Sequence, residues 1–538
     1  MDTSQRAVPL GVPISSSDES SHTSSHHNHD YPVPSQLSPD LAWSQQNLLS
    51  LDGGGIRGYW TLLVLQQLMI CIAREESRQM NGSEEHHSFY PSQFPSNVTR
   101  GDYNDEEKEK RRLAPGHRAF TWACVRDARK FLPCHYFDYI CGSSTGALIA
   151  IMLGRFRMPV WDCLQEYEKM SHLIFGKPRI ISQRNIGIVQ WPKFSATAME
   201  KAFQDVTARR REQILRSTED ITFPSPQGIC QTFVTTRGYE RKKDAPVTVE
   251  KLYLLRTYVP GRRERLVSRS RQLTNSSTFN DERRNERSAD NWQVWRVARA
   301  ATAAPMYFTE LAHRQDGISE SGTVTYFSDG GFGAENNPTD EGITEIRSLH
   351  GLENLGAVVN VGTSRKKQQA GGKSFFKRVH NSFDRATDPD SVAAKVASMN
   401  LPYEWRFNDE SGIDVELDEW KPNGYFSKSP GVKTLEKIKS KFNEWAADPE
   451  NSAYLRRCAR ELVSRRRARI RNFAKWEIYA TSASYMCEIG ECRNRPIADR
   501  TTLETHLRST HSVAESEIYS TVGAATKMWR YQIPHAEA

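Results

Sequence analysis

One serine stands in a short pattern typical of nucleophilic catalysis. The run Gly142-Ser143-Ser144-Thr145-Gly146 is a G-x-S-x-G pentapeptide, and the helix-forming run Ala147 to Gly154 follows it. A serine at the tip of a sharp strand-to-helix turn needs small neighbours, because the backbone folds back on itself and the substrate must approach. The helix that follows favours a developing oxyanion through its positive dipole end. A chain of this length contains roughly 0.1 to 0.2 such matches by chance, so the flanking strand and helix patterns carry the prediction that Ser144 is a nucleophile.

A second glycine-rich run, Gly53-Gly54-Gly55-Ile56-Arg57-Gly58, follows the apolar segment Asn47 to Leu51. In form it matches the G-x-G-x-x-G turn of dinucleotide-binding proteins. Three details disfavour a nucleotide: Asp52 directly precedes the glycines, Arg57 lies inside the loop, and no acidic residue closes a strand about 20 residues later. The loop instead offers unobstructed backbone N–H donors beside a helix N-terminus, and such donors can hold the oxyanion of a tetrahedral intermediate.

An acidic residue ends another apolar segment. Asp329 follows Tyr326-Phe327-Ser328, precedes Gly330 and Gly331, and is followed by Asn336-Asn337-Pro338. An acid in this position is either a turn residue or the carboxylate of a site at the end of a strand. The segment alone leaves both explanations open.

Taken in order, the three segments resemble the patatin-like phospholipase family, with its Asp-Gly-Gly-Gly-x-Arg-Gly loop, G-x-S-x-G elbow and Asp-Gly-Gly motif. The run Ala298 to Pro305 keeps the register of a stretch common in that family, but it departs at Ala301 and Thr302, where threonine and then serine are more frequent. Asn336-Asn337-Pro338 and Val361-Gly362-Thr363 are also similar to family positions. The resemblance covers residues 47–365.

The resemblance implies a Ser/Asp dyad rather than a Ser/His/Asp triad. Ser144 would attack the ester carbonyl, Asp329 would accept its proton, and water would then hydrolyse the acyl-enzyme. The oxyanion site would consist of Gly53, Gly54, Gly55 and Arg57, and the motif glycines would be Gly58, Gly142, Gly146, Gly330 and Gly331. Because a carboxylate is ordinarily a poor base for a hydroxyl, the site must compensate by desolvation and oxyanion stabilisation.

The order of strand, glycine turn and helix occurs twice, around Asp52 and around Ser144. This repetition predicts an α/β domain with a mostly parallel central sheet covered by helices on both faces, as the patatin-like resemblance also implies. Further strands are expected at residues 232–236, 249–258, 323–328 and 355–361, and a helix at 59–80.

The composition divides the chain into five predicted segments. Residues 1–45 are rich in Ser, His and Pro and bury too little apolar surface to order, so they are expected to be a disordered tail. The patatin-like hydrolase domain is expected at 46–450, with inserted loops at 81–115 and 261–290. A basic helix (451–480), a zinc-finger-like segment (481–515) and a tail (516–538) follow.

Four residues near the C-terminus have approximately the spacing of a zinc finger. Cys487 and Cys492 precede His506 and His511, and Leu503 stands where a finger has its core leucine. Pro496 and Ile497 occupy the place of the usual aromatic residue. The segment is either a structural zinc site or a helical tail without metal. No cofactor is expected for catalysis, and a single finger reads only about 3 bp, so nucleic acid is not the expected partner.

The net charge of +8 is concentrated in one segment. Between Leu455 and Lys475 there are nine basic residues and one acid, Glu461, a difference of eight. Such a strip suits anionic lipid headgroups or nucleic acid, whereas the simpler explanations are a solvated helix face or packing against the catalytic domain.

No run of about 18 uncharged apolar residues is present, since Gln66 and Gln67 interrupt the segment Tyr59 to Arg74, which is expected to be a buried helix. The N-terminus lacks the basic and apolar pattern of a secretion signal, and nine scattered cysteines suggest free thiols. We therefore expect a cytoplasmic protein, peripheral on intracellular membranes, acting in lipid catabolism on phospholipid or neutral lipid. The alternative is a catalytically retired hydrolase domain that serves as a nucleic-acid- or partner-binding regulator through its basic tail.

Overall fold

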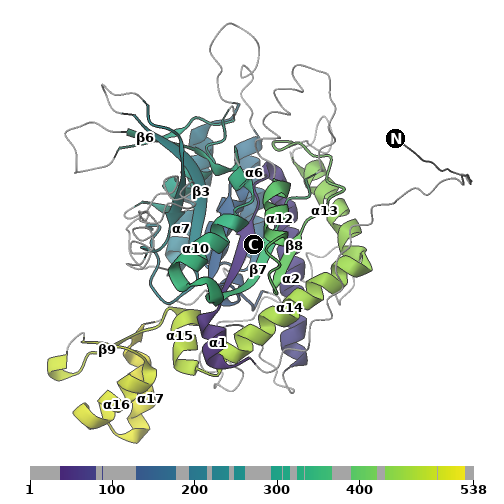
Figure 1. The fold of residues 1–538 in the computed structure, drawn as a ribbon. Coiled ribbons are helices and arrows are strands. Elements are labelled where there is room, and N and C mark those ends of the chain that lie inside the picture. Colours follow the sequence, from purple (N-terminus) through teal and green to yellow (C-terminus); the bar gives the residue numbers. More distant parts are fainter. Residues whose placement is uncertain are drawn as a thin grey trace, which may run out of the picture. The chain divides into compact units, whose positions relative to one another are not determined.

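The computed structural model describes most of the chain between residues 37 and 527 (Figure 1). The described residues are 37–79, 88, 129–176, 193–214, 221–241, 247–260, 292–305, 307–314, 324–332, 334–365, 389–420, 431–492 and 495–527, all within the compact unit Leu37–Ala538. The predictions for residues 1–36, for the loop at 81–115 apart from Ser88, and for the loop at 261–290 fall outside these ranges.

The main sheet has eight strands among the described residues, in the order β5-β6-β3-β2-β1-β7-β8, with β4 beside β3. The strands are β1 (Gln46–Leu51), β2 (Tyr139–Ser143), β3 (Gln231–Arg241), β4 (Lys251–Arg256), β5 (Leu311–Arg314), β6 (Val324–Asp329), β7 (Leu355–Val361) and β8 (Glu404–Phe407). The run from β3 through β2, β1 and β7 to β8 is parallel, whereas β4, β5 and β6 join in antiparallel pairs. The predicted fold class, a mostly parallel α/β sheet, is confirmed.

Helices surround this sheet. The longer ones are α1 (Pro39–Ser44), α2 (Gly58–Arg78), α5 (Thr145–Ala150), α6 (Val160–Phe175), α7 (Ala196–Ile214), α9 (Val294–Ala301), α10 (Thr339–His350), α12 (Pro389–Ala397), α13 (Val432–Ala447), α14 (Pro449–Ile470) and α15 (Phe473–Thr481). Short helical turns are η1 (Gly55–Arg57), η3 (Pro133–His135), η6 (Gly330–Phe332), η7 (Ala334–Asn336) and η8 (Leu352–Asn354), and a π-helical turn, η4 (Ile151–Arg155), continues α5.

Both faces of the sheet are buried beneath helices, as strand β1 illustrates. Leu49 and Leu51 point into the large core shared with α2, α5 and α6. Leu48, between them, points to the opposite face and packs in a second cluster with Ile343 of α10 and Val392 of α12. Because successive side chains of a strand alternate between faces, a strand covered on both sides becomes an almost continuous apolar run.

Helix α2 is apolar enough, by length and composition, to cross a membrane: a span is possible within Gly55–Arg78. In the structure 83% of that window is buried inside the protein, and its side chains belong to the main core. The predicted strand at 355–361 coincides with β7, and the helix expected at 59–80 is α2.

Helix α1 corrects the expectation of disorder up to residue 45. Ser38 caps the helix by accepting from the N–H of Leu41, and Pro39 occupies its first turn. The indole of Trp43 donates to the carbonyl of Arg469 at 3.1 Å, 426 residues further along the chain. Arg469 also donates to the carbonyls of Ala42 and Gln45. Contacts with residues far away in the sequence therefore hold the segment, and its polar local composition gives no sign of them.

The predicted boundary at residue 450 is also wrong, because α14 is part of the main core. Leu455, Leu462 and Val463 of α14 belong to the same apolar cluster as the buried side chains of α2. A kink after Ile470 separates α14 from α15, so the basic helix expected at 451–480 is two helices.

The basic residues of α14 do not form one exposed strip. Arg465, Arg466 and Arg469 are buried, and their charges are compensated inside the protein. Arg466 donates to Glu76 of α2 at 2.9 Å, and Arg469 donates to both carboxylate oxygens of Asp138 at 2.9 and 2.7 Å. Packing against the catalytic domain therefore explains this face, since buried charges of this kind must be paired.

The last described residues form a small module with its own core. It contains β9 (Ser484–Cys487), η9 (Gly490–Cys492), β10 (Arg495–Ile497), α16 (Arg500–His511), α17 (Glu515–Ala524) and β11 (Thr526–Lys527), with β9 central in a three-stranded sheet. Leu503 is buried in this core as predicted, and Tyr485 supplies an aromatic side chain. The module extends to residue 527, so the first part of the expected tail at 516–538 belongs to it.

Candidate active site

Ser144 lies at a sharp turn between β2 and α5. Its backbone has φ 53° and ψ −124°, a conformation that non-glycine residues rarely adopt. The turn is so tight that a Cβ at Gly142 would lie 2.1 Å from the carbonyl oxygen of Gly146. The glycines of the pentapeptide are therefore required by the close approach of the backbone, as the sequence pattern predicts.

The structure brings Asp329 to Ser144 from a distant part of the chain. Asp329 ends β6, which pairs with β3, and β3 lies beside the strand that leads into Ser144. The Ser144 hydroxyl donates to Oδ2 of Asp329 at 2.7 Å, and the N–H of Gly331 donates to Oδ1 at 2.7 Å. Both carboxylate oxygens of Asp329 therefore accept a hydrogen bond, and the Ser144 hydroxyl already donates to the group that can accept its proton.

Burial makes Asp329 a stronger base than an ordinary carboxylate. Its side chain is 1% exposed, and loss of hydration raises the pKa of Asp329 from 3.8 to about 7. The hydrogen bonds from Ser144 and from the Gly331 N–H oppose this rise in pKa but do not cancel it. A carboxylate with a pKa near neutrality suits proton transfer better than one near 4.

The glycine loop, residues Gly53 to Gly58, lies beside the serine. A Cβ at Gly53 would lie 2.3 Å from Oδ1 of Asn336 and 3.0 Å from Cβ of Ser144, so a side chain there would collide with the site. The N–H of Gly53 donates to the carbonyl of Asn336, and the N–H of Arg57 to the carbonyl of Gly54. The N–H groups of Gly54 and Gly55 donate to no backbone carbonyl within the described ranges.

A pocket opens at the serine and the glycine loop. Its lining includes Ser144, Asp329, the first three loop glycines, Arg57 and Arg365. An apolar wall continues from there, made by Leu148, Met170, Ile174, Phe175, Met199 and Phe308. An apolar cleft with a few convergent polar groups is the usual form of a small-molecule or lipid site.

No histidine is among the described residues that line the pocket. His135, the nearest candidate in sequence, has its ring nitrogens 2.6 Å from the Ser88 hydroxyl and 3.0 Å from the Ala480 carbonyl. His135 therefore links the turn before β2 to helix α15, and its role is structural.

Several residues at the site escape sequence reasoning. Tyr167 donates its hydroxyl to the Gly55 carbonyl at 2.6 Å, and the Ile56 N–H donates to the Leu417 carbonyl at 2.8 Å. Asn360 and Arg406 contact Asp52, directly before the glycine loop. Four of these residues lie in no recognisable motif, and only the three-dimensional structure shows that they belong to the site: Tyr167, Asn360, Arg406 and Leu417.

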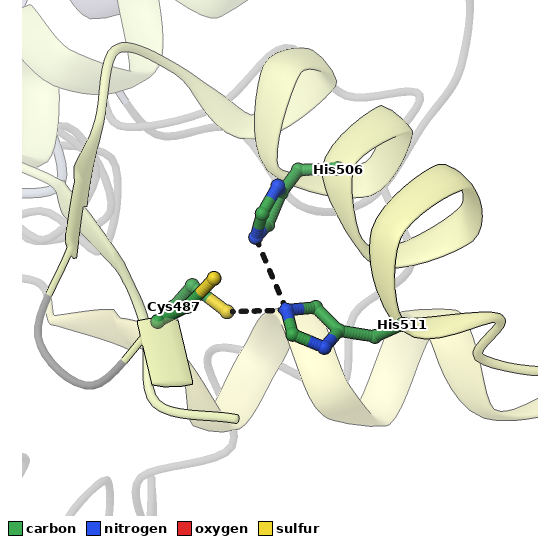
Figure 2. A group of neighbouring side chains, drawn as sticks. Cys487, His506 and His511 are labelled. Atoms are coloured by element: carbon green, nitrogen blue, oxygen red, sulfur yellow. Dashed lines mark hydrogen bonds between the residues drawn. The ribbon is translucent and has the colours of Figure 1, made fainter. Parts of the chain in front are cut away.

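The four predicted metal-ligating residues converge in the C-terminal module. One donor atom from each of Cys487, Cys492, His506 and His511 lies within 4.8 Å of every other. Figure 2 shows the side chains of Cys487, His506 and His511 pointing toward one another, with Cys487 Sγ 3.2 Å from His511 Nε2. This Cys/His group could hold a metal ion. None of the described cysteines is in a disulfide, and all of them except Cys492 are buried.

The fold and site together define a class: a mostly parallel α/β protein with a serine on a strand-to-helix turn, hydrogen-bonded to a buried aspartate beside a glycine loop. Residues 121–343 match the family model described as patatin-like phospholipase, which confirms the resemblance drawn from the motifs. The matched segment contains Ser144 and Asp329, whereas the glycine loop precedes it.

The chain is also similar to curated proteins. It is 25% identical over 295 residues to calcium-independent phospholipase A2-gamma of Oryctolagus cuniculus and 26% identical over 296 residues to that of Mus musculus. Each match covers 53% of this chain and 32% of the relative. Phospholipase A I of Arabidopsis thaliana is 23% identical over 326 residues, 54% of this chain and 23% of the relative. The chain thus spans about a third, or less, of the length of these relatives.

Proposed function

We propose that this chain is a lipid acyl hydrolase that cleaves carboxylic ester bonds with Ser144 as nucleophile and Asp329 as general base. The observation that carries this proposal is the 2.7 Å hydrogen bond from the Ser144 hydroxyl to a buried carboxylate, beside a glycine loop and an apolar pocket. The family match and the phospholipases among the relatives support the same chemistry.

In the first half of the reaction, Ser144 Oγ adds to the ester carbonyl carbon while its proton passes to Asp329. The carbonyl oxygen becomes an oxyanion, which the N–H groups of Gly54 and Gly55 stabilise in this proposal, with Arg57 adding positive charge nearby. Collapse of this intermediate expels the alcohol, which takes the proton from Asp329, and leaves an acyl-enzyme.

In the second half, water gives a proton to Asp329 as its oxygen adds to the acyl carbonyl. The second tetrahedral intermediate then expels Ser144, which recovers the proton, and the carboxylic acid leaves. Every step uses side chains and backbone groups of this chain, so the proposed reaction needs no cofactor.

The substrate class follows from the pocket. Six apolar side chains, from Leu148 to Phe308, continue the site away from Ser144, which suits the acyl chain of a phospholipid or neutral lipid. Such a substrate resides in membranes or lipid droplets, and we therefore propose a cytoplasmic enzyme of lipid catabolism that acts at the surface of an intracellular membrane.

The alternative, a retired hydrolase domain that binds nucleic acid through its tail, loses much of its support. The arginines that would form a basic strip are partly buried in ion pairs with Glu76 and Asp138. The site residues also remain in hydrogen-bonding contact, which a retired site has no need to preserve.

A fluorophosphonate probe tests the proposal without knowledge of the natural lipid. We expect the purified chain to be labelled covalently and to release fatty acid from phosphatidylcholine vesicles, whereas Ser144→Ala should show neither activity. Ser143→Ala is a matched control, because the neighbouring hydroxyl is buried and lies outside the pocket lining. Equal labelling of wild type and Ser144→Ala, or no labelling of either, would refute the proposal.

We further propose that zinc is the metal of the Cys/His group and that its role is structural. In a tetrahedral site with Zn–S of about 2.3 Å and Zn–N of about 2.0–2.1 Å, neighbouring donor atoms lie roughly 3.3–3.8 Å apart. The separations of 3.2 Å from His511 Nε2 to both Cys487 Sγ and His506 Nε2 are close to that range. Two thiolates and two imidazoles are also a donor set that zinc prefers.

Metal analysis of the purified protein checks the zinc proposal. We expect one zinc per chain in the wild type and none in Cys487→Ser or His511→Ala, because losing one of four ligands opens the site. A chelator should expose the amides of residues 483–527 to hydrogen exchange while β1 and β2 stay protected. His313→Ala, a histidine on β5 in the main sheet, is the control. A wild type that contains no zinc after growth in zinc-supplemented medium would contradict the assignment.

A further inference from the structure

We propose that Arg406, on β8, is a positioning residue for the oxyanion site: with Asn360 it holds the carboxylate of Asp52, and so fixes the backbone that begins the glycine loop. The inference rests on the proposed function, because it gives the loop a role in ester hydrolysis. Arg406 lies beyond the segment matched by the family model and in no motif of the sequence.

The three side chains meet where neighbouring parallel strands end. Asp52 follows β1, Asn360 lies on β7 opposite Ser50, and Arg406 lies on β8 opposite Asn360. Asn360 Nδ2 donates to Oδ1 of Asp52 at 2.7 Å, and Arg406 donates to Oδ2 at 3.1 Å. Arg406 also donates to the side-chain oxygen of Asn360, so the three groups are linked to one another, and its second terminal nitrogen lies 3.5 Å from the carboxylate of Asp390.

This network holds one end of the glycine loop. The N–H of Asp52 donates to the Val361 carbonyl at 3.1 Å, and the N–H of Gly53 donates to the Asn336 carbonyl at 2.9 Å. Beyond the glycines, the Ile56 N–H is held by the Leu417 carbonyl. The N–H groups of Gly54 and Gly55 lie between these anchors, so their direction depends on both ends remaining fixed.

Arg406 also compensates a charge that would oppose catalysis. Asp52 is 1% exposed, and burial raises its pKa, while the positive charge of Arg406 and the donor of Asn360 oppose this rise in pKa. An uncompensated carboxylate one residue before the loop would repel a developing oxyanion, because charges interact strongly where water is excluded. Without Arg406, Asp52 must take up a proton or admit water, and either change displaces the start of the loop.

A displacement of this kind should affect the transition state more than substrate binding. A shift of about 1 Å in a catalytic group can lower the rate about 100-fold, and loss of one oxyanion donor costs about 10²- to 10³-fold in kcat. The apolar wall of the pocket, which binds the acyl chain in the proposed reaction, is built by α5, α6, α7 and the region after α9, and so does not include Arg406.

The test compares Arg406→Gln and Arg406→Lys with wild type on a soluble p-nitrophenyl ester, with active sites counted by fluorophosphonate titration. For Arg406→Gln we expect kcat to fall about 100-fold, with KM changed by less than about threefold. The inhibition constant of a trifluoromethyl ketone, whose adduct with the serine carries an oxyanion, should rise by a similar factor. Arg406→Lys keeps the charge but not the planar fork, and should recover part of the loss.

Arg460→Gln, an exposed arginine on α14, is the control and should keep the wild-type kcat. Lower thermal stability of Arg406→Gln with kcat per active site and ketone binding unchanged would overturn the proposal, because Arg406 would then be structural only. If Arg406→Gln does not fold, Arg406→Lys decides by the same two measurements. A wild-type chain with no esterase activity and no fluorophosphonate labelling refutes the proposed function itself, so the two failures are distinguishable.

Discussion

Replacement of Asp329 by asparagine is expected to lower kcat for ester hydrolysis by about 10⁴-fold. Asparagine has nearly the shape of aspartate and can keep a hydrogen bond with Ser144, but it cannot take the serine proton. The measurement is steady-state hydrolysis of a soluble ester, normalised to protein concentration. Asp414→Asn is the matched control, since Asp414 is fully exposed and stands three positions before the pocket residue Leu417 in the sequence, and it should retain wild-type kcat.

The same residue predicts how activity depends on pH. The pKa of Asp329 is raised to about 7 by burial, so the carboxylate is ionised above pH 7 and protonated below it. Since only the ionised form can accept the serine proton, kcat/KM should fall about tenfold per pH unit below 7 and level off above it. Full activity at pH 5, or an unchanged acid limb in the residual activity of Asp329→Asn, would show that another group is the base.

The second large effect concerns stability. Arg469→Met is expected to lower the free energy of unfolding by about 3–5 kcal/mol, because it leaves the charge of Asp138 buried without its partner. Arg469 is 1% exposed on its side chain and also donates to the carbonyls of Ala42 and Gln45. Asp138 in turn accepts from the N–H of Asn47 in β1 at 2.7 Å.

Urea unfolding followed by tryptophan fluorescence measures this effect. Arg471→Met, an exposed arginine two residues further on, should change the free energy of unfolding by less than about 0.5 kcal/mol. If the two variants were equally stable, the buried pair would contribute nothing. The basic segment would then again be open to explanation as a surface for lipid or nucleic acid.

The sequence predicts the local parts of the site well, because residues close together in the sequence determine their geometry. The tight turn at Ser144 needs Gly142 and Gly146, and the apolar runs before Asp52 and Ser144 identify the strands that carry them. That Asp329 meets Ser144, 185 residues away, follows from the family resemblance and not from any spacing. Arg406 lies on the short strand β8, which has only four residues. Its alternation of polar and apolar residues is too short to predict a strand from the sequence.

The arginine-rich helix shows why the other parts escape prediction. A run of charged residues ordinarily indicates a solvated helix face. Here Arg466 and Arg469 are buried because they pair with carboxylates that lie 390 and 331 residues away in the sequence. The approximate zinc-finger spacing identifies the four Cys and His residues, but the extent of the module to residue 527 depends on β11, which has two residues and pairs with β9. Contacts of such long range leave no periodic signal in the sequence.

The hydrogen bonds between Arg469 and the segment around Trp43 have a consequence for the folding of the chain during its synthesis on the ribosome. A chain leaves the ribosome from its N-terminus, and the first strand of the sheet emerges long before the helix that holds it in place. More than 400 further residues must be synthesised after the central strand β1 before Arg469 is available. Only then can Arg469 bond to Ala42 and Asp138, which precede it by 427 and 331 positions. Nascent chains should therefore expose apolar surface and rely on chaperones until the end of α14 has been made.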